Sequence, residues 1–115
     1  MLQRLLATFC AVPGVVGVTL LDSQGELRAS ILAPDFEGQD AASGMSQLLH
    51  SAERLSSEGG LGRLEQLWVE SESGSALLAP LVGGYVLLIT SQGESNLGRL
   101  RYEVETRMGV FEDLL

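Results

Sequence analysis

Cysteine and histidine, two side chains that often act as a nucleophile, a general base or a metal ligand, are rare in this chain. It has one cysteine, Cys10, and one histidine, His50, so it can form no internal disulfide and assemble no zinc-type ligand set. A Ser-His-Asp or Cys-His site would have to use His50, but Gln47 and Arg54 lie one turn away and place it on a polar stripe of a predicted helix. We therefore expect a surface or interface histidine, an inert core thiol at Cys10, no catalytic residues and no bound metal.

The glycine-rich segments are the other candidates for chemistry, because a phosphate-binding loop needs glycines. Residues 59–62 read Gly-Gly-Leu-Gly, and Gly83 and Gly84 are adjacent. Neither segment is followed by the Lys-Ser or Lys-Thr pair of a phosphate loop, and the chain has no lysine. A helix cap and a hairpin turn are the expected structures, so we predict no cofactor.

The charge of the chain argues against several classes of partner. Fifteen acidic side chains stand against seven arginines, which gives a formal net charge of −8. A negative field of this size repels phosphate backbones and anionic lipid, so we expect neither nucleic-acid nor membrane binding. Hydrophobic residues make up 45% of the 115 residues, which favours a domain that shares apolar surface with a neighbour. We expect a single domain over residues 1–115 in the reducing cytoplasm.

Five segments have the composition of β-strands and are separated by turn sequences. They are residues 15–21, 26–32, 63–71, 75–82 and 85–91. The last three follow one another without an intervening helix, as in a meander of antiparallel strands. Pro80 cannot donate to a β-ladder, so it has to lie near the end of its strand.

Three further segments carry apolar residues at helical spacing. They are residues 2–12, about 40–57 and about 95–111. The order of elements is thus α-β-β-α-β-β-β-α, which predicts an α+β fold with a five-stranded antiparallel sheet and helices on both faces.

The second and the last predicted helices differ in the side chains on their surfaces. In the second, Ala41, Met45, Leu48 and Ala52 step along one face like a coiled-coil seam, and the small residues allow another element to approach closely. The last helix is rich in charge and offers i,i+4 ion pairs, for which we expect Arg99 with Glu103 and Arg101 with Glu105.

The strand at residues 63–71 is predicted to leave one edge of the sheet open. As the first strand of the meander it pairs on one side only, unless another element or another chain supplies a partner. It contains no proline and carries Leu67, Trp68 and Val69, so an uncovered edge would be an aggregation hazard. We expect this edge to pair with a second chain. Trp68 is either an anchor of that interface or a core residue, because the alternation around it is imperfect.

The order of elements and several local sequences together resemble the roadblock family, the dynein-light-chain-like domains whose bacterial members include regulators of small Ras-like GTPases. The matching segments are residues 13–25, 67–70, 77–81, 85–89 and 96–101. The resemblance spans nearly the whole chain, although none of these segments is a catalytic signature.

The resemblance implies a homodimer and a GTPase partner. The strand at residues 63–71 would pair with its symmetry mate, and the second helices would lie side by side across the two-fold axis. The predicted dimer interface is Leu67, Trp68, Val69, Ala41, Met45, Leu48 and Ala52. Gln47, His50 and Arg54, on the exposed stripe of the second helix, are the candidates for contacting the GTPase. Arg54 could also act as an arginine finger in trans, but a binding surface is the preferred interpretation.

Two alternatives stay open. A sheet with flanking helices also describes profilin-like sensory domains, which would need a polar-lined pocket between sheet and helix for a small molecule. A purely structural dimerisation adaptor would differ from a GTPase regulator only in its partner. In each case the protein itself is expected not to be an enzyme.

Overall fold

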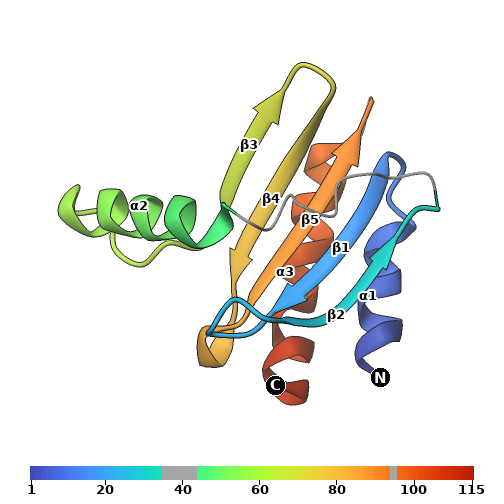
Figure 1. Cartoon of the computed structure of the whole chain (residues 1–115), viewed down its shortest axis with the longest axis horizontal. Coiled ribbons are helices and arrows are strands. Elements are labelled where there is room, and N and C mark those ends of the chain that lie inside the picture. The colour runs from blue at the N-terminus through green and yellow to red at the C-terminus, as the bar shows by residue number, and fades with distance from the viewer. Residues whose placement is uncertain (35–43, 94–95) are drawn as a thin grey trace.

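The computed structural model describes residues 1–34, 44–93 and 96–115 (Figure 1). In these residues, three α-helices accompany one five-stranded sheet, which confirms the predicted fold class and order of elements. The helices and strands are α1 (Leu2–Cys10), β1 (Val15–Leu21), β2 (Leu27–Leu32), α2 (Met45–Glu58), β3 (Leu67–Ser71), β4 (Gly74–Pro80), β5 (Val86–Gln92) and α3 (Leu97–Leu114).

The strands are antiparallel throughout and lie in the order β2-β1-β5-β4-β3. The hairpins β1–β2 and β3–β4 form the two sides of the sheet. β5 joins them by pairing with both β1 and β4. Pro80 is the last residue of β4, opposite Val86, so its missing N–H interrupts no strand interior. A turn of 3-10 helix over Val82–Gly84 connects β4 to β5, and Gly83 and Gly84 have positive φ angles there, as a tight turn requires.

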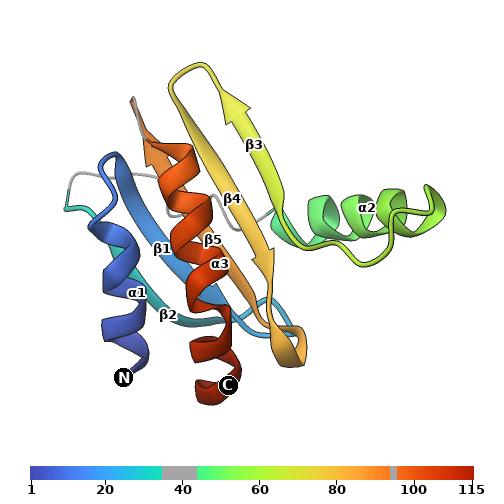
Figure 2. The same ribbon diagram turned by 180° about the vertical axis from the view of Figure 1, so that it is seen from behind.

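One face of the sheet is covered by α1 and α3, which lie side by side when the molecule is seen from behind (Figure 2). This layer holds the larger core, because apolar residues at alternate strand positions meet the buried faces of both helices. Phe9 from α1 and Phe111 from α3 stack with ring centroids 6.1 Å apart. The other buried members include Leu6, Val12, Val18, Leu20, Leu77, Leu87, Ile89, Leu100 and Val104.

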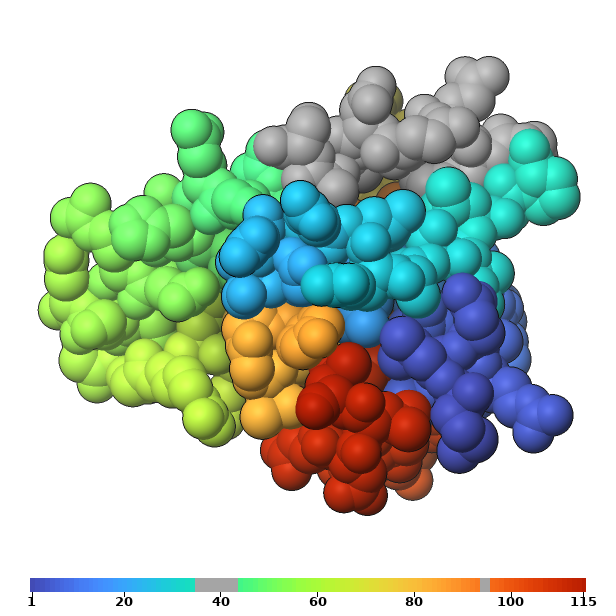
Figure 3. Space-filling model, turned by 60° about the horizontal axis from the view of Figure 1, so that its bottom comes forward, coloured from blue at the N-terminus to red at the C-terminus, as the bar shows by residue number. Residues whose placement is uncertain are grey.

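The opposite face carries a smaller core, and α2 contributes to it only by its first turns. Met45 and Leu49, which are 5% and 8% exposed, pack there with buried leucines and valine from the strands. The rest of α2 extends sideways beyond β3, past the edge of the sheet (Figures 1 and 2). The space-filling view shows it as a lobe that stands out from the body of the molecule (Figure 3).

Several predicted boundaries are wrong by part of an element. Residues 63–66 lead into β3 but do not pair, so this strand begins at Leu67 instead of residue 63. The last helix continues to Leu114, and Asn96 caps it by accepting a hydrogen bond of 2.9 Å from the N–H of Arg99. Residues 40–43, the predicted start of the second helix, lie outside the described residues.

Two expectations about single side chains are corrected. Cys10 is exposed, not a core thiol, because it falls on the outer side of the last turn of α1. The charged pairs on α3 also differ from the expected ones: within the described part of the chain Glu103 pairs with Arg107, at 2.7 Å, and neither Arg99 nor Arg101 has an ion pair. Arg107 also contacts α1, because its Nε donates a hydrogen bond to Oγ1 of Thr8.

Candidate protein-interaction site

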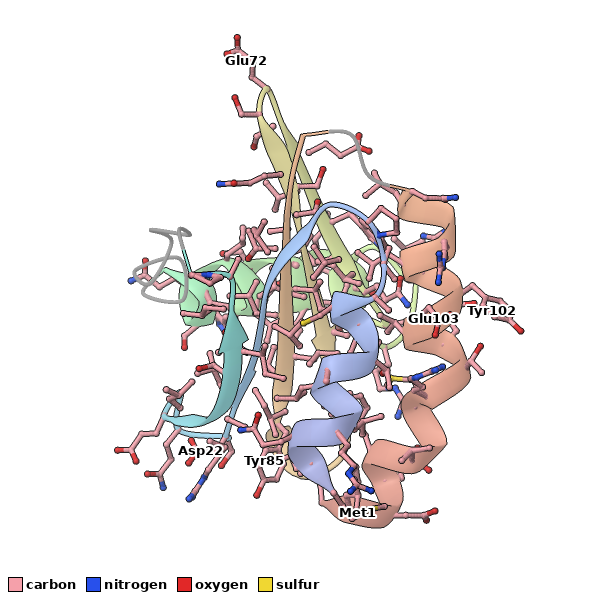
Figure 4. All side chains as sticks on the ribbon, turned by 90° about the vertical axis from the view of Figure 1, so that its right-hand side faces the viewer. Met1, Asp22, Glu72, Tyr85, Tyr102 and Glu103 are labelled. Carbon is pink, nitrogen blue, oxygen red and sulfur yellow. The ribbon has the colours of Figure 1, made fainter. Side chains whose placement is uncertain are left out.

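The edge of the sheet at β3 is open in the described part of the chain. β3 pairs with β4 alone, in a register that places Trp68 opposite Leu77 and Ser71 opposite Gly74. The turn between the two strands is only Glu72 and Ser73, which projects from the end of the sheet (Figure 4). The structure thus contains the edge that the sequence analysis predicted, and nothing in the described residues covers it.

The three interface candidates of β3 divide between the two faces of the sheet. Leu67 packs with the smaller core, and Val69 lies on that same side by strand alternation. Trp68 points the other way and packs against the larger core. Its indole Nε1 donates a hydrogen bond of 3.0 Å to Oε1 of Gln66. Trp68 is therefore both a core residue and an edge residue, and all three side chains are half-buried in the single chain.

The interface candidates of α2 do not form one continuous seam. Met45 is buried in its own chain, whereas Leu48 is 44% exposed and Ala52 is half-buried. Leu55, one turn further along, is 71% exposed. The distal part of α2 thus presents apolar side chains that the described residues leave exposed. The remaining predicted interface residue, Ala41, lies outside the described residues.

The three candidates for contacting a partner, Gln47, His50 and Arg54, are all exposed on α2. Arg54 is engaged with Glu58, because its Nη2 and Nε lie 3.1 and 3.3 Å from Oε1 of that glutamate one turn away. An arginine finger would have to leave this contact. His50 and Cys10 lie on helices at opposite edges of the sheet, so the fold does not bring them together as a Cys-His pair (Figure 1).

The described residues form three surface hollows near β3. One of about 400 Å³ is lined by Trp68, Glu70, Leu97, Gly98 and Arg101, on the side of α3. A second, of about 440 Å³, lies between α3 and the lead into β3, where the glutamates Glu65, Glu105 and Glu112 surround apolar side chains such as Met108. A third, of about 270 Å³, opens on the other face of the sheet beside Val69, Ser71, Ala76 and Thr90. The second lies between the sheet and a helix, where the small-molecule pocket of a sensory domain is expected.

No helix in the described ranges combines the length and apolar character needed to cross a bilayer. In the same ranges, no group of three or more His, Cys, Asp and Glu side chains is placed to hold a metal ion.

This arrangement of helices around an antiparallel sheet has close structural counterparts. The Roadblock/LC7 domain of Streptomyces avermitilis superposes with a TM-score of 0.83 at 18% sequence identity, over 96% of this chain and 94% of that chain. MglB of Myxococcus xanthus superposes with a TM-score of 0.78 at 17% identity, over 96% of each chain. A structure described as MglB with tetrameric arrangement gives 0.78 at 14% identity, over 90% of this chain and 79% of that one.

Sequence comparison identifies the family directly. The uncharacterized protein MJ0714 of Methanocaldococcus jannaschii is 32% identical over 101 residues, which span 88% of this chain and 85% of that protein. The family model of the Roadblock/LC7 domain matches residues 1–91, from the first helix through the last strand. The resemblance noted in the sequence is thereby confirmed, and the chain belongs to the Roadblock/LC7 family.

Proposed function

We propose that this protein is a homodimeric, non-enzymatic module that binds a small Ras-like GTPase and regulates or scaffolds it. Membership of the Roadblock/LC7 family supports the general kind of function, because bacterial members of the family that the sequence resembles include regulators of such GTPases. The observation that carries the dimer is the open edge of β3 beside a helix whose apolar side extends beyond that edge.

The backbone of β3 is suited to pairing with a second copy. Because the two-residue turn closes on Ser71 and Gly74, alternate residues face β4, and Trp68 and Glu70 turn their N–H and C=O groups to the open edge. An antiparallel copy that overlaps all of β3 places Val69 on the two-fold axis and Trp68 opposite the partner's Glu70. Two sheets of five strands would then form one sheet across the dimer, and the exposed edge would be removed.

The projection of α2 fits the same arrangement. A two-fold axis at Val69 brings the partner's α2 across the half of β3 and β4 nearest the hairpin turn. That surface holds the hollow of about 270 Å³ beside Val69 and Ala76. The exposed leucines of the incoming helix, Leu48 and Leu55, would be removed from water there, at about 25 cal/mol per Å² of apolar area buried.

Charged substitutions in β3 test the dimer. Leu67→Arg or Val69→Arg would place an unpaired charge in the buried seam and should weaken self-association by several kcal/mol. Sedimentation equilibrium over a range of micromolar concentrations should show a dimer for the wild type and monomer for these variants. Thr106→Arg, an exposed position on α3, is the control and should remain dimeric. A wild-type chain that stays monomeric throughout would remove the proposed dimer.

The polar side of α2 is the proposed surface for the GTPase. Gln47, His50 and Arg54 are exposed and face away from the apolar residues Met45 and Leu49 that anchor the helix. In the dimer two copies of this surface would lie on the same face of the extended sheet. One GTPase could then contact the α2 helices of both protomers, whereas a monomer has only one such helix.

Binding and hydrolysis measurements test this surface. The probe is a purified small Ras-like GTPase from the source organism, loaded with GDP or with a GTP analogue, and calorimetry should detect binding. Replacing Gln47, His50 and Arg54 together by alanine should lower the affinity at least tenfold. Tyr102→Ala is the matched control, because Tyr102 is 65% exposed and points to solvent from α3 (Figure 4). Failure of every such GTPase to bind the wild-type dimer would contradict the proposal.

The rate of GTP hydrolysis separates the remaining possibilities. A regulator changes the rate when it is added to the bound GTPase, whereas an adaptor leaves the rate unchanged. An effect that is lost in Arg54→Ala but kept in Arg54→Lys would indicate a contribution from the charge of Arg54. A cytoplasmic location is part of the proposal, because Ras-like GTPases and their GTP are found there.

A further inference from the structure

The hollow of about 400 Å³ at the edge of β3 is incomplete in the single chain. Its walls are Trp68 and Glu70 on β3 and Leu97, Gly98 and Arg101 on the first turns of α3. The guanidinium carbon of Arg101 lies 5.8 Å from the centroid of the Trp68 ring, within the range of a cation–π contact. The side toward the open edge has no wall, because no strand in the described residues lies beyond β3.

Two opposite charges line this hollow without neutralising each other. Arg101 and Glu70 are both exposed, and neither takes part in an ion pair within the described residues. Arg101 is held over the indole instead of reaching along the strand to Glu70 of its own chain. An unpaired cation and an unpaired anion thus stand beside the edge at which a second copy would join.

The register of the proposed dimer decides which residue reaches Arg101. Full antiparallel overlap of β3, which runs from Leu67 to Ser71, pairs Trp68 directly with the partner's Glu70. Residues directly opposite in neighbouring strands have Cβ atoms about 4.5–5.5 Å apart and lie on the same face of the sheet. The partner's carboxylate would therefore emerge beside the indole ring that carries Arg101.

We propose that Arg101 of each protomer forms an ion pair with the partner's Glu70 over the Trp68 ring, so that two symmetric ion pairs close the two hollows and make self-association depend on charge. The inference rests on the proposed homodimer. It adds two residues, Arg101 and Glu70, whose opposite charges would favour pairing between two copies of this chain. The occupant of the hollow is the second copy of this chain, and the supporting observations are the complementary unpaired charges and the continuity with the open edge.

Charge reversal in separate chains tests the ion pair. Glu70→Arg alone and Arg101→Glu alone should each weaken the homodimer about tenfold or more at low salt, because like charges then meet across the interface. A mixture of the two variants should form a heterodimer more stable than either homodimer, since both of its trans contacts unite opposite charges. An ion pair within one chain would remain repulsive in the mixture and would give no such preference.

A second pair of variants controls for net charge. Asp113→Arg and Arg4→Glu carry the same changes in total charge at exposed positions on α3 and α1, and their mixture should show only the statistical proportion of heterodimer. Native mass spectrometry measures these proportions, and circular dichroism verifies that each variant is folded. The double variant with both Glu70→Arg and Arg101→Glu should dimerise within a few-fold of the wild type.

The outcomes distinguish this inference from the dimer proposal. A statistical proportion of heterodimer from Glu70→Arg and Arg101→Glu, with the wild type dimeric, overturns the ion pair and leaves the dimer standing. A wild type that is monomeric in the same measurement overturns the dimer itself. Preferential heterodimer formation that weakens between 50 and 500 mM salt supports both.

Discussion

Arg107 on α3 donates a hydrogen bond of 3.0 Å from Nε to Oγ1 of Thr8 on α1, and so joins the last helix to the first. Thr8 in turn donates to the carbonyl oxygen of Leu5 at 2.6 Å. The Nη1 of Arg107 lies 2.7 Å from Oε2 of Glu103, an atom that is shielded from solvent and accepts no hydrogen bond within the described residues. One guanidinium therefore serves both a hydroxyl and a shielded carboxylate between the helices.

Removing that guanidinium should destabilise the fold more than removing its hydroxyl partner. Arg107→Met leaves the Glu103 carboxylate shielded and unpaired and should lower the free energy of unfolding by about 2–3 kcal/mol, whereas Thr8→Val should cost about 1 kcal/mol. Urea denaturation followed by circular dichroism measures both. Arg99→Met, an exposed arginine without an ion pair in the described part, should change stability by less than about 0.5 kcal/mol. Equal effects of Arg107→Met and Arg99→Met would contradict this account.

Asp22 makes the stability of the first hairpin depend on pH. Its Oδ1 accepts hydrogen bonds from the N–H groups of Glu26 at 3.0 Å and Gln24 at 2.9 Å, and its Oδ2 lies 3.0 Å from Nη2 of Arg28. The Glu26 N–H is the largest cause of the lowered pKa of Asp22, and the Gln24 N–H and Arg28 lower it further against the opposing effect of burial. The ionised carboxylate thus stabilises the folded state more than the protonated form does.

The contribution of ionised Asp22 to the stability of the folded state should be complete above the pKa of an aspartate in the unfolded chain, about 3.9. It should disappear as the pH falls through the lower pKa that Asp22 has in the folded state. Asp22→Asn should therefore remove part of the loss of stability between about pH 4 and pH 2. Urea denaturation at a series of pH values measures this difference. Glu26→Gln, an exposed carboxylate on the same hairpin, is the control. An Asp22→Asn profile parallel to that of the wild type across this range would count against the assignment.

The sheet could be predicted from the sequence because turns and strand composition are local signals. The first strand ends where predicted, at Leu21. Pro80 lies at the end of its strand, as predicted from its lack of an N–H group alone. The sequence places residues 63–66 in the same strand as Leu67, because no turn residue separates them from it. In the register of β3 with β4, however, Glu65 would lie opposite Pro80, which has no N–H to donate to the ladder.

The candidate site could be predicted only in outline. The open edge follows from the order of the strands. Which residues of α2 are buried and which are exposed cannot be derived in the same way. Periodicity places Met45 and Leu48 on one helical face, whereas the structure buries Met45 and exposes Leu48, because the face of α2 that meets the sheet carries Met45 and Leu49, one turn apart. The contact of Arg101 with Trp68 joins residues 33 positions apart, and no local signal in the sequence indicates it.

Two adjacent leucines of α2 should behave differently. Leu49 is 8% exposed in the smaller core, so Leu49→Ala should lower the free energy of unfolding of the single chain by about 2–4 kcal/mol. Leu48 is 44% exposed, so Leu48→Ala should cost less than about 1 kcal/mol at concentrations where the chain is monomeric. At concentrations where it dimerises, Leu48→Ala should instead weaken association. Urea denaturation at two protein concentrations, with sedimentation of both variants, would show whether the two leucines separate in this way.

Gly74 should be the least replaceable residue of the hairpin that carries β3. It starts β4 opposite Gln92, and a Cβ atom there would overlap the backbone carbonyl oxygen of Ser91 in the adjacent strand. Because the obstacle is backbone, relief requires β4 and β5 to separate, so Gly74→Ala should cost about 1–3 kcal/mol and also weaken any pairing through β3. Gly109→Ala, in the middle of α3 with open space around its Cα, should stabilise the chain by about 0.5–1 kcal/mol. Thermal and urea denaturation of both variants measure the contrast, and a Gly74→Ala protein as stable as the wild type would show that the strands are not held as closely as described.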